Sequence, residues 1–305
     1  MVIRIDKTKR LRLRPSVSVV PTSSESIWEF FQSNSRQTRH IRIRDKRLID
    51  EVIKLESSSL EEVVMANSDL KLEFAHLFDA LMNWCLIEYC DVAEWIQDSK
   101  NYRTLNFLAD FIPSYSLVNE AKRLAKSNVL IFGCGGIGGI IADAIASMGV
   151  HGLMLCDPDT VKPHNLNRGI FTEGDLDKYK SEVLKQRFSS LYPDVEVICV
   201  NELISEKTQV ASLFKKLEKI DLVVNAADYP NVDATSKLIF PECMKLKIPH
   251  IVAGGYNLHL SLIGPTILPK ETPCFKCIEV GLEKLQDEDF THLRKLVRPK
   301  RNIGN

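Results

Sequence analysis

The chain has 305 residues, of which 45% are hydrophobic and 26% charged, a composition that indicates a globular protein with one large domain or two smaller ones. No stretch reaches the roughly 18 apolar residues of a membrane span, and the N-terminus lacks an apolar signal core, so we expect a cytoplasmic protein without membrane contact. The net charge is zero, but residues 1–47 carry twelve Lys/Arg against four Asp/Glu. This basic excess indicates either an anionic partner or a solvated face.

The N-terminal third predicts a small mixed module. Residues 11–20 (LRLRPSVSVV) and 40–44 (HIRIR) alternate apolar and polar residues, as half-buried strands do. Helical patterns follow in KRLIDEVIKLE, after a capping box of Ser59 and Glu62, and over about 70–90. We therefore predict an α+β, winged-helix-like module over 1–95.

The pattern changes near residue 100, where a second domain, 100–305, is predicted to begin. Short apolar runs alternate with helical patterns, which is typical of a parallel sheet covered on both faces. We expect a Rossmann-like α/β domain with a mostly parallel sheet. Its strands are predicted at 128–132, 152–157, 195–200, 221–228 and 250–255.

A glycine-rich loop joins the first of these strands to a helix. In GCGGIGG, Gly133, Gly135 and Gly138 fit a dinucleotide fingerprint, which needs a tight turn, a close approach of backbone to phosphate and close helix packing. The helix N-terminus adds free N–H groups for phosphate. Asp157 ends the second strand, where an acid can bind ribose hydroxyls. The loop predicts a nucleotide site without distinguishing NAD from ATP.

Charged residues after Asp157 favour ATP. Asn165, Arg168 and Lys180 fall in a loop and an early helix beside the expected phosphates. An enzyme that expels pyrophosphate must neutralise charge that builds on the phosphates, whereas a dehydrogenase does not break its cofactor there. Asp228 follows the fourth apolar run at the mouth of the sheet, where a carboxylate can hold magnesium. Singly, Asn165, Arg168 and Lys180 are each better explained as surface residues, and Asp228 can be explained as a turn or cap residue before Pro230, so the prediction rests on their combination.

These motifs resemble a known family. GCGGIGG, Asp157, NLNR, DKYK, AAD and TPCFKC occur in the order and spacing of ThiF/MoeB/HesA proteins, which share their fold with ubiquitin-activating enzymes, over roughly residues 100–280. The resemblance implies ATP-dependent adenylation of a peptide or protein carboxylate, usually in a homodimer. It also implies that the phosphates are lined by Gly135 and Gly136, the ribose is bound by Asp157, the triphosphate is contacted by Asn165, Arg168 and Lys180, and magnesium is held by Asp228.

Two features of the family pattern are incomplete. Family members usually place two CxxC pairs around one zinc ion, because four thiolates form a tetrahedral site. Here Cys274 and Cys277 supply one pair, and the sequence ends without a second, which indicates a truncated sequence or a lost zinc site and leaves zinc binding open. The family also has an arginine that reaches the partner subunit's active site. Arg103 in NYRTLNF is the candidate, although its gap to Gly133 is a few residues longer than usual.

The N-terminal module resembles the peptide clamp of enzymes that modify ribosomally made peptides. The branch that combines such a clamp with this adenylating domain includes the microcin C enzyme MccB and the pantocin enzyme PaaA. An exposed strand edge can bind a leader peptide by main-chain pairing, and the basic excess would suit an acidic leader. We therefore predict an enzyme of antibiotic biosynthesis that activates a carboxylate of a precursor peptide with ATP, so that a new bond or ring forms within the peptide.

Three alternative functions remain. A sulfur-carrier adenylyltransferase of the MoeB or ThiF type lacks a counterpart of the N-terminal module. An NAD-dependent dehydrogenase does not explain Arg168, Lys180 and Asp228 together. A winged helix that binds nucleic acid, fused to a nucleotide sensor, would explain the basic N-terminus, and its binding would fall steeply with salt.

Overall fold

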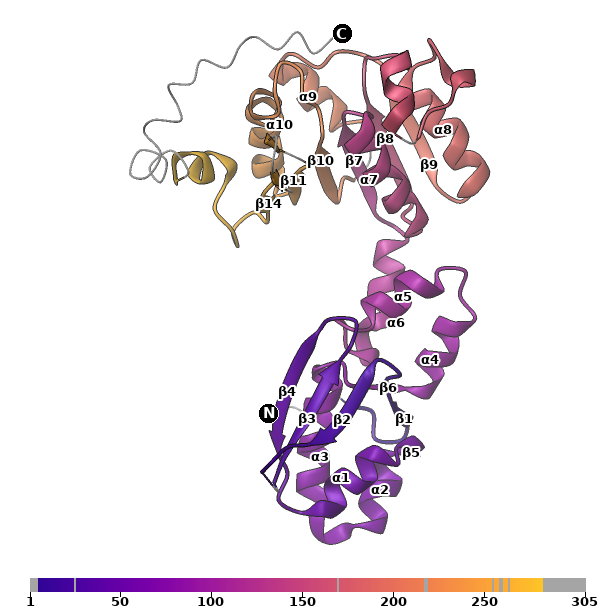
Figure 1. Cartoon of the computed structure of the whole chain (residues 1–305), viewed down its shortest axis with the longest axis vertical. Coiled ribbons are helices and arrows are strands. Elements are labelled where there is room, and N and C mark those ends of the chain that lie inside the picture. Colours follow the sequence, from indigo (N-terminus) through magenta and orange to yellow (C-terminus); the bar gives the residue numbers. More distant parts are fainter. Residues whose placement is uncertain are drawn as a thin grey trace. The chain divides into compact units, whose positions relative to one another are not determined.

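The computed structural model describes residues 5–281 apart from 25, 169, 217–218, 254, 258–259 and 263, and for 56–57, 168, 208, 255–257 and 260–262 it describes the backbone alone. The chain forms two compact units, Met1–Ala125 and Lys126–Asn305 (Figure 1). None of the described helices is long and apolar enough to cross a membrane.

The N-terminal unit contains two antiparallel sheets, in the strand orders β2-β3-β4 and β5-β1-β6 (Figure 1). The strands are β1 (Arg10–Leu13), β2 (Val17–Pro21), β3 (Ile27–Gln32), β4 (Gln37–Arg42), β5 (Glu56–Ser59) and β6 (Ile87–Tyr89). The helices are α1 (Lys46–Ile53), α2 (Leu60–Ala66), α3 (Lys71–Asn83), α4 (Cys90–Gln97), α5 (Tyr102–Leu108) and α6 (Ser114–Leu124). The predicted mixture of strands followed by short helices is confirmed.

Local details differ from the prediction. The run at 11–20 is two strands, because the chain turns at Pro15, where the N–H of Val17 donates to the carbonyl of Arg14 at 3.0 Å. The capping box of Ser59 and Glu62 is present at the start of α2. The unit also extends to Ala125, beyond the predicted boundary at 95, because apolar residues of α4, α5 and α6 belong to its core.

A buried ionic network links these elements. The Arg14 guanidinium, in a side chain that is 2% exposed, lies 2.7 Å from a carboxylate oxygen of Glu88 and 3.0 Å from one of Asp110. The same oxygen of Asp110 accepts from the amide of Gln32, and its other oxygen accepts from Asn34. Buried charges are stable only when paired and hydrogen-bonded, and both carboxylates meet that condition here. The network fixes β1, β6 and the end of β3 against the segment after α5.

The C-terminal unit contains a six-stranded sheet in the order β14-β11-β10-β7-β8-β9, which is parallel except for β14 (Figure 1). Its strands are β7 (Asn128–Phe132), β8 (Gly152–Cys156), β9 (Glu196–Val200), β10 (Leu222–Asn225), β11 (His250–Val252) and β14 (Thr266–Ile267), and a separate hairpin pairs β12 (Gly255–Asn257) with β13 (Leu260–Leu262). The helices are α7 (Gly136–Ser147), α8 (Lys180–Leu191), α9 (Lys207–Leu213) and α10 (Val232–Leu246). The predicted Rossmann-like fold and its five parallel strands are confirmed.

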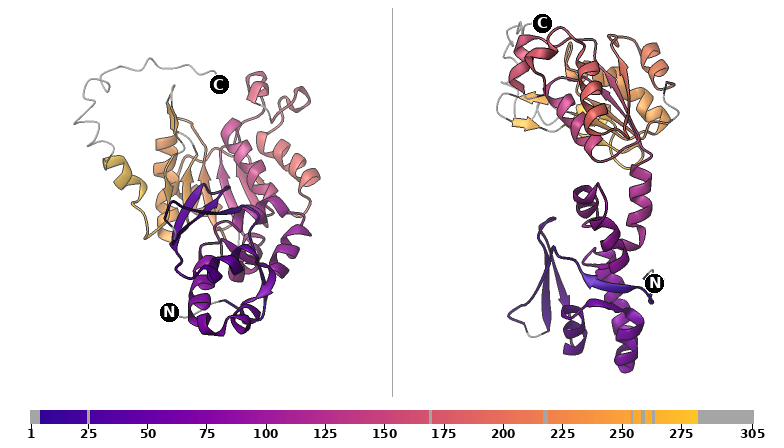
Figure 2. Two further views of the ribbon diagram at one scale, coloured as in Figure 1. Left: turned by 60° about the horizontal axis from the view of Figure 1, so that its bottom comes forward. Right: turned by 90° about the vertical axis from the view of Figure 1, so that its right-hand side faces the viewer.

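Both faces of this sheet are covered (Figure 2). Leu130 and Met154 pack with buried residues of α9 and α10. Their neighbours Val129 and Leu153 are buried too, and alternation along a strand directs them to the opposite face, where α7 and α8 pack against each other. Short apolar strands covered on both faces explain why the sequence reads as continuous apolar runs.

His250 in β11 makes the stability of this unit sensitive to acid. Its ring is buried, with Nδ1 2.9 Å from the carbonyl of Ile248 and Nε2 without a partner among the described residues. Burial lowers the pKa of His250, so the folded form holds a neutral ring while the unfolded chain protonates below about pH 6.5. Stability is therefore present above that pH and lost as the pH falls.

We expect the unfolding free energy to fall on acidification more steeply in the wild type than in His250→Leu, by up to about 1.4 kcal/mol per pH unit below about pH 6.5. Denaturant unfolding between pH 7.5 and 5 measures the slope, and His164→Leu, at an exposed histidine, is the control. Equal slopes for the wild type and His250→Leu would contradict this assignment.

Candidate active site

The glycine loop lies where the strand order reverses, between β7 and β10. Gly133 has φ +83°, and a Cβ there would lie 2.6 Å from the carbonyl carbon of Ala226. At Gly138 a Cβ would lie 1.8 Å from the carbonyl oxygen of Gly133, which is the close helix packing predicted from the motif. Gly135, by contrast, has no atom within 4 Å of such a Cβ. The chain is therefore crowded beneath the loop and open at the start of α7.

The start of α7 offers unoccupied donors. Gly135 is the N-cap residue and provides no side-chain hydrogen bond, so the first N–H groups of the helix are not capped by it. Gly136 is the first residue of the helix. Free N–H groups and the helix dipole make such a terminus suitable for phosphate.

Asp157 follows β8 and binds the glycine loop directly. One carboxylate oxygen accepts from the N–H of Cys134 at 2.5 Å, and the other accepts from the N–H of Asp159 at 2.8 Å. Burial raises the pKa of Asp157, and the nearby Lys180 ammonium opposes that shift. The carboxylate thus holds the loop in place, and its role in binding ribose stays a prediction.

Lys180, the first residue of α8, is buried beside this carboxylate. Its ammonium lies 2.8 Å from a carboxylate oxygen of Asp159, and its N–H donates to the carbonyl of the same residue at 3.0 Å. The Lys180 side chain is 9% exposed, whereas that of Asp159 is 67% exposed. The exposed partner can therefore be exchanged for another anion without uncovering the lysine.

Asp228 lies three residues beyond β10 and is exposed. The loop that carries it is anchored by the buried Asn225, whose amide donates to Thr235 at 3.0 Å and Ser236 at 2.9 Å. The side-chain oxygen of Asn225 accepts from the N–H of Ala227 at 3.1 Å. The loop is thus fixed while its carboxylate faces solvent, and magnesium binding by Asp228 stays a prediction.

The remaining predicted residues are less closely connected. Asn165 accepts from the N–H of Lys162 at 2.9 Å within the short 3₁₀ segment Pro163–Arg168, so its oxygen closes a local turn. The side chain of Arg168 lies outside the described residues. Arg103 is exposed on α5 in the N-terminal unit. Homodimer formation and the role of Arg103 across it stay predictions.

The cysteine pair provides half of a zinc site. Cys274 and Cys277 hold their sulfur atoms 3.3 Å apart. The N–H of Cys277 donates to the Cys274 thiol and lowers its pKa. A closed zinc site needs four such ligands, and the described residues contain no group of three or more His, Cys, Asp or Glu that could hold a metal. Two thiols alone do not fit a structural zinc ion.

Sequence reasoning missed two residues of this site. Asp159 stands two positions after Asp157 in CDPDT, and the acid repeated at the end of a strand was the available signal. Asn225 ends the apolar run DLVVN, where a polar residue in a buried strand indicates a specific hydrogen-bonding role.

The residues present fit a nucleoside triphosphate. The open space at Gly135 leaves room for phosphate oxygens, the uncapped N-terminus of α7 has N–H groups that can donate to them, and the buried ammonium of Lys180 lies near the same loop. Magnesium usually binds through one or two carboxylates together with phosphate oxygens, so one exposed aspartate matches its requirement.

The ion pair of Lys180 and Asp159 should be measurable as a coupling. Asp159→Asn removes the carboxylate that is hydrogen-bonded to a buried ammonium, and we expect it to reduce the free energy of unfolding by about 1–2 kcal/mol, less than for a fully buried pair because Asp159 is largely exposed. In Lys180→Met, the same change at Asp159 should have little effect. A double-mutant cycle in denaturant gives the coupling energy. Additive effects would mean that the pair does not stabilise the fold.

Comparisons with known proteins agree with this geometry. The ThiF family matches residues 111–299. The sulfur carrier protein ThiS adenylyltransferase of Escherichia coli K12 is 34% identical over 160 residues, 52% of this chain and 60% of the relative. Ubiquitin-like modifier-activating enzyme 5 of Dictyostelium discoideum is 29% identical over 170 residues, 53% of this chain and 44% of the relative. The chain thus spans 60% or less of the length of these two relatives.

A solved structure is similar over a larger part of the chain. The crystal structure of E. coli MccB with ATP has a TM-score of 0.69 at 20% identity and covers 92% of this chain and 81% of that chain. At this identity the likeness concerns the fold, and its coverage includes the N-terminal unit as well as the nucleotide-binding one. Because the family match covers more than half of the sequence, the chain belongs to the ThiF family.

Proposed function

We propose that this protein uses ATP and magnesium to adenylate a carboxylate of a ribosomally made precursor peptide, leading to a new bond or ring within that peptide. ThiF-family members are ATP-dependent adenylyltransferases. The observation that carries the proposal is the combination of an open, uncapped helix N-terminus with a separate N-terminal unit. Crystal structures contain E. coli MccB with ATP and with AMPCPP together with MccA, a precursor peptide.

In this proposal the chain binds and orients ATP, which supplies the adenylyl group. The N–H groups of Gly135 and Gly136 donate to phosphate oxygens, and Lys180 exchanges its bond with Asp159 for one with the triphosphate. Asp157 keeps the loop fixed through Cys134 while binding the ribose, and Asn165 and Arg168 add contacts to the triphosphate. Such fixed donors stabilise charge on the leaving pyrophosphate without reorganising during the reaction.

ATP binding gives a test that needs no peptide. A ligand that binds only the folded state raises the melting temperature. We expect ATP to raise the Tm, magnesium to raise it further, and NAD to leave it unchanged. Asp228→Ala should lose the magnesium-dependent part alone, because Asp228 is exposed and its removal leaves the packing intact. Thermal unfolding measures this, with Asp233→Ala, an exposed acid at the start of α10, as the control. A full magnesium response in Asp228→Ala would refute the assignment.

The peptide is proposed to bind along β4, the better of the two edges of the sheet β2-β3-β4. The N–H of Ile43 donates to the carbonyl of Ser26, and antiparallel alternation then directs the N–H and C=O groups of Thr38, His40 and Arg42 away from β3. No described strand pairs with that side. An added strand therefore finds three consecutive pairing positions.

The opposite edge, β2, offers fewer bonds. The same alternation points Val17, Val19 and Pro21 outward, because Ser33 donates to the carbonyl of Ser16. The N–H of Val17 is already bonded to Arg14, and proline has no N–H. Only one position on β2 therefore retains both groups.

The charge near β4 suits an acidic peptide. Arg36, Arg42 and Arg44 are exposed, and none has an ion pair in the part of the chain that the structure describes. Arg39, in contrast, lies over the Trp84 ring at 5.1 Å. Three unpaired guanidinium groups along one edge favour carboxylates of a partner strand through complementary charge.

Removing one main-chain donor from β4 tests this edge. Thr38→Pro deletes an outward N–H, whereas Thr38→Val changes the side chain and keeps that donor. We expect Thr38→Pro to weaken binding about tenfold or more for peptides selected from a random display library on the intact chain, and Thr38→Val to preserve it. Fluorescence anisotropy gives both affinities, with the ATP-induced Tm shift as a check of folding. Equal affinities for the two variants would exclude pairing at Thr38.

A sulfur-carrier protein is the second candidate substrate, since the 34% identity to the E. coli ThiS adenylyltransferase favours it. That function would leave the N-terminal unit without a role in substrate binding. The two candidates are distinguished by adding a sulfur-carrier protein to the Thr38→Pro variant: binding that is strong and unaffected by the substitution supports the sulfur-carrier function.

A further inference from the structure

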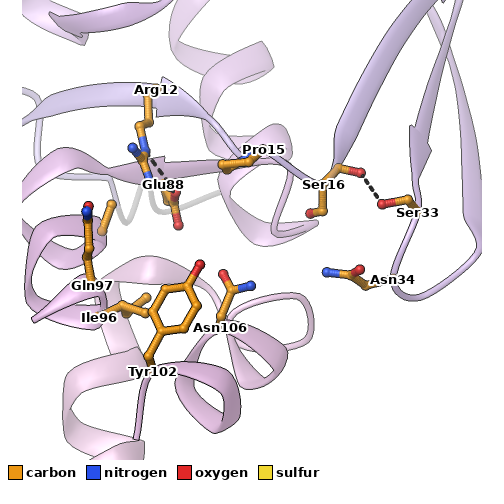
Figure 3. A pocket seen from close by; sticks show the side chains of 11 residues that line it. Arg12, Pro15, Ser16, Ser33, Asn34, Glu88, Ile96, Gln97, Tyr102 and Asn106 are labelled. Carbon is orange, nitrogen blue, oxygen red and sulfur yellow. Dashed lines mark hydrogen bonds and ion pairs between the residues drawn. The ribbon is translucent and has the colours of Figure 1, made fainter. Parts of the chain in front are cut away.

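A cavity of about 640 Å³ lies inside the N-terminal unit, between the sheets and the helices α4 and α5 (Figure 3). Its size is within the range of small-ligand pockets. We propose that it is a specificity site for the peptide and receives a primary carboxamide, the side chain of an Asn or Gln. This inference rests on the proposed peptide substrate and adds to it the kind of residue that is read.

The charges around the cavity balance. Glu88 faces the cavity and is bound by Arg12 at 2.8 Å and Arg14 at 2.7 Å. Behind it, Asp110 is bound by Arg14. Two guanidinium groups thus meet two carboxylates, and a charged ligand would lose its hydration without finding an unpaired counter-charge. The lining therefore favours an uncharged polar group.

Two asparagines give this preference a specific pattern. Asn34 donates its Nδ2 to Asp110 at 2.7 Å, so its Oδ1 is the free atom. Asn106 accepts from Arg14 at 3.3 Å through Oδ1, so its Nδ2 is free. Neither free atom has a hydrogen-bond partner among the described residues. One free acceptor and one free donor, oriented by the ionic network, match the donor and the acceptor of a carboxamide.

The geometry of the lining supports one common binding space. Figure 3 shows Asn34 and Asn106 on opposite sides of one space, with the Tyr102 hydroxyl directed into the adjoining space. The Tyr102 hydroxyl and the Gln97 amide also have no partner among the residues that the structure describes. The ring of Tyr102 and the side chain of Ile96 supply apolar contact for the stem of an incoming residue.

The cavity is placed to be reached by a peptide on β4. Ser33 and Asn34 line it and belong to the turn that joins β3 to β4. That turn lies at the Gln37 end of β4. A peptide strand that pairs with β4 at Thr38 therefore has one of its two ends near the turn and the cavity. The edge provides bonds to any sequence, whereas the cavity distinguishes side chains.

Selection from a random heptapeptide display library on the intact chain tests this inference. We expect the enriched peptides to share Asn or Gln at one position, and replacement of that residue by Asp or Glu to weaken binding at least tenfold. Asn106→Asp, which keeps the acceptor for Arg14 but removes the free donor, should abolish the preference. Gln97→Trp should fill the cavity and do the same, while Glu94→Trp, at an exposed position of α4 outside the cavity, should preserve it.

The outcomes separate this inference from the proposed function. Two outcomes overturn the carboxamide site and leave the peptide edge intact. In the first, the selected peptides require the Thr38 donor but show no preference for Asn or Gln. In the second, they show this preference, and it is as strong in Asn106→Asp and Gln97→Trp as in the wild type. Peptides indifferent to Thr38→Pro overturn the edge and the inference with it, as does a library without enrichment. The Asn-to-Asp exchange within the peptide uses the wild-type protein, so misfolding of a variant does not decide the result.

Discussion

The close backbone contact between Gly133 and Ala226 is the constraint on which the nucleotide site depends. A Cβ there would lie 2.6 Å from main-chain atoms of Ala226, so the end of β7 and the loop after β10 are in direct backbone contact. The first residues of α7 are held equally close at Gly138. The glycine loop, the start of α7 and the distant loop after β10 are thereby fixed at the carboxyl ends of adjacent parallel strands, where α/β proteins bind ligands. Because the contacts are between backbones, neighbouring side chains cannot relieve a substitution at either glycine.

The sequence predicted the C-terminal unit well because its signals are local. Buried parallel strands read as apolar runs, and the glycine motif reports its own steric needs at Gly133 and Gly138. The first unit ends at Ala125 and not at 95, since apolar residues of α5 and α6 such as Leu105 and Leu117 belong to the first core, and the sequence does not show which of two neighbouring cores such a helix joins. The partner of Lys180 was also not predictable. A hydrogen bond between an acid after β8 and a lysine that begins α8 depends on how distant segments pack.

Charge is treated differently in the interior and on the surface of the chain. Two buried cations have carboxylate partners: Arg14 meets Glu88 and Asp110, and Lys180 meets Asp159. Charges removed from water need such compensation, because desolvation otherwise exceeds what the fold can offset. The exposed arginines near β4 remain hydrated and do not need an ion-pair partner. Interior pairs therefore fix shape, while the unpaired surface charge is available to attract a partner.

Recognition by a strand edge alone would be a poor way to choose one peptide. Main-chain bonds at Thr38, His40 and Arg42 are the same for every sequence, and long-range charge selects only a sign. Discrimination requires a site whose polar groups become covered when the peptide binds and are then left unsatisfied by the wrong side chain, since an unmade buried hydrogen bond penalises binding more than a made one favours it. The free oxygen of Asn34 and the free amide nitrogen of Asn106 are held by the same buried network that stabilises the unit. In the proposed function, fold stability and peptide selection in the N-terminal unit thus depend on one set of ion pairs.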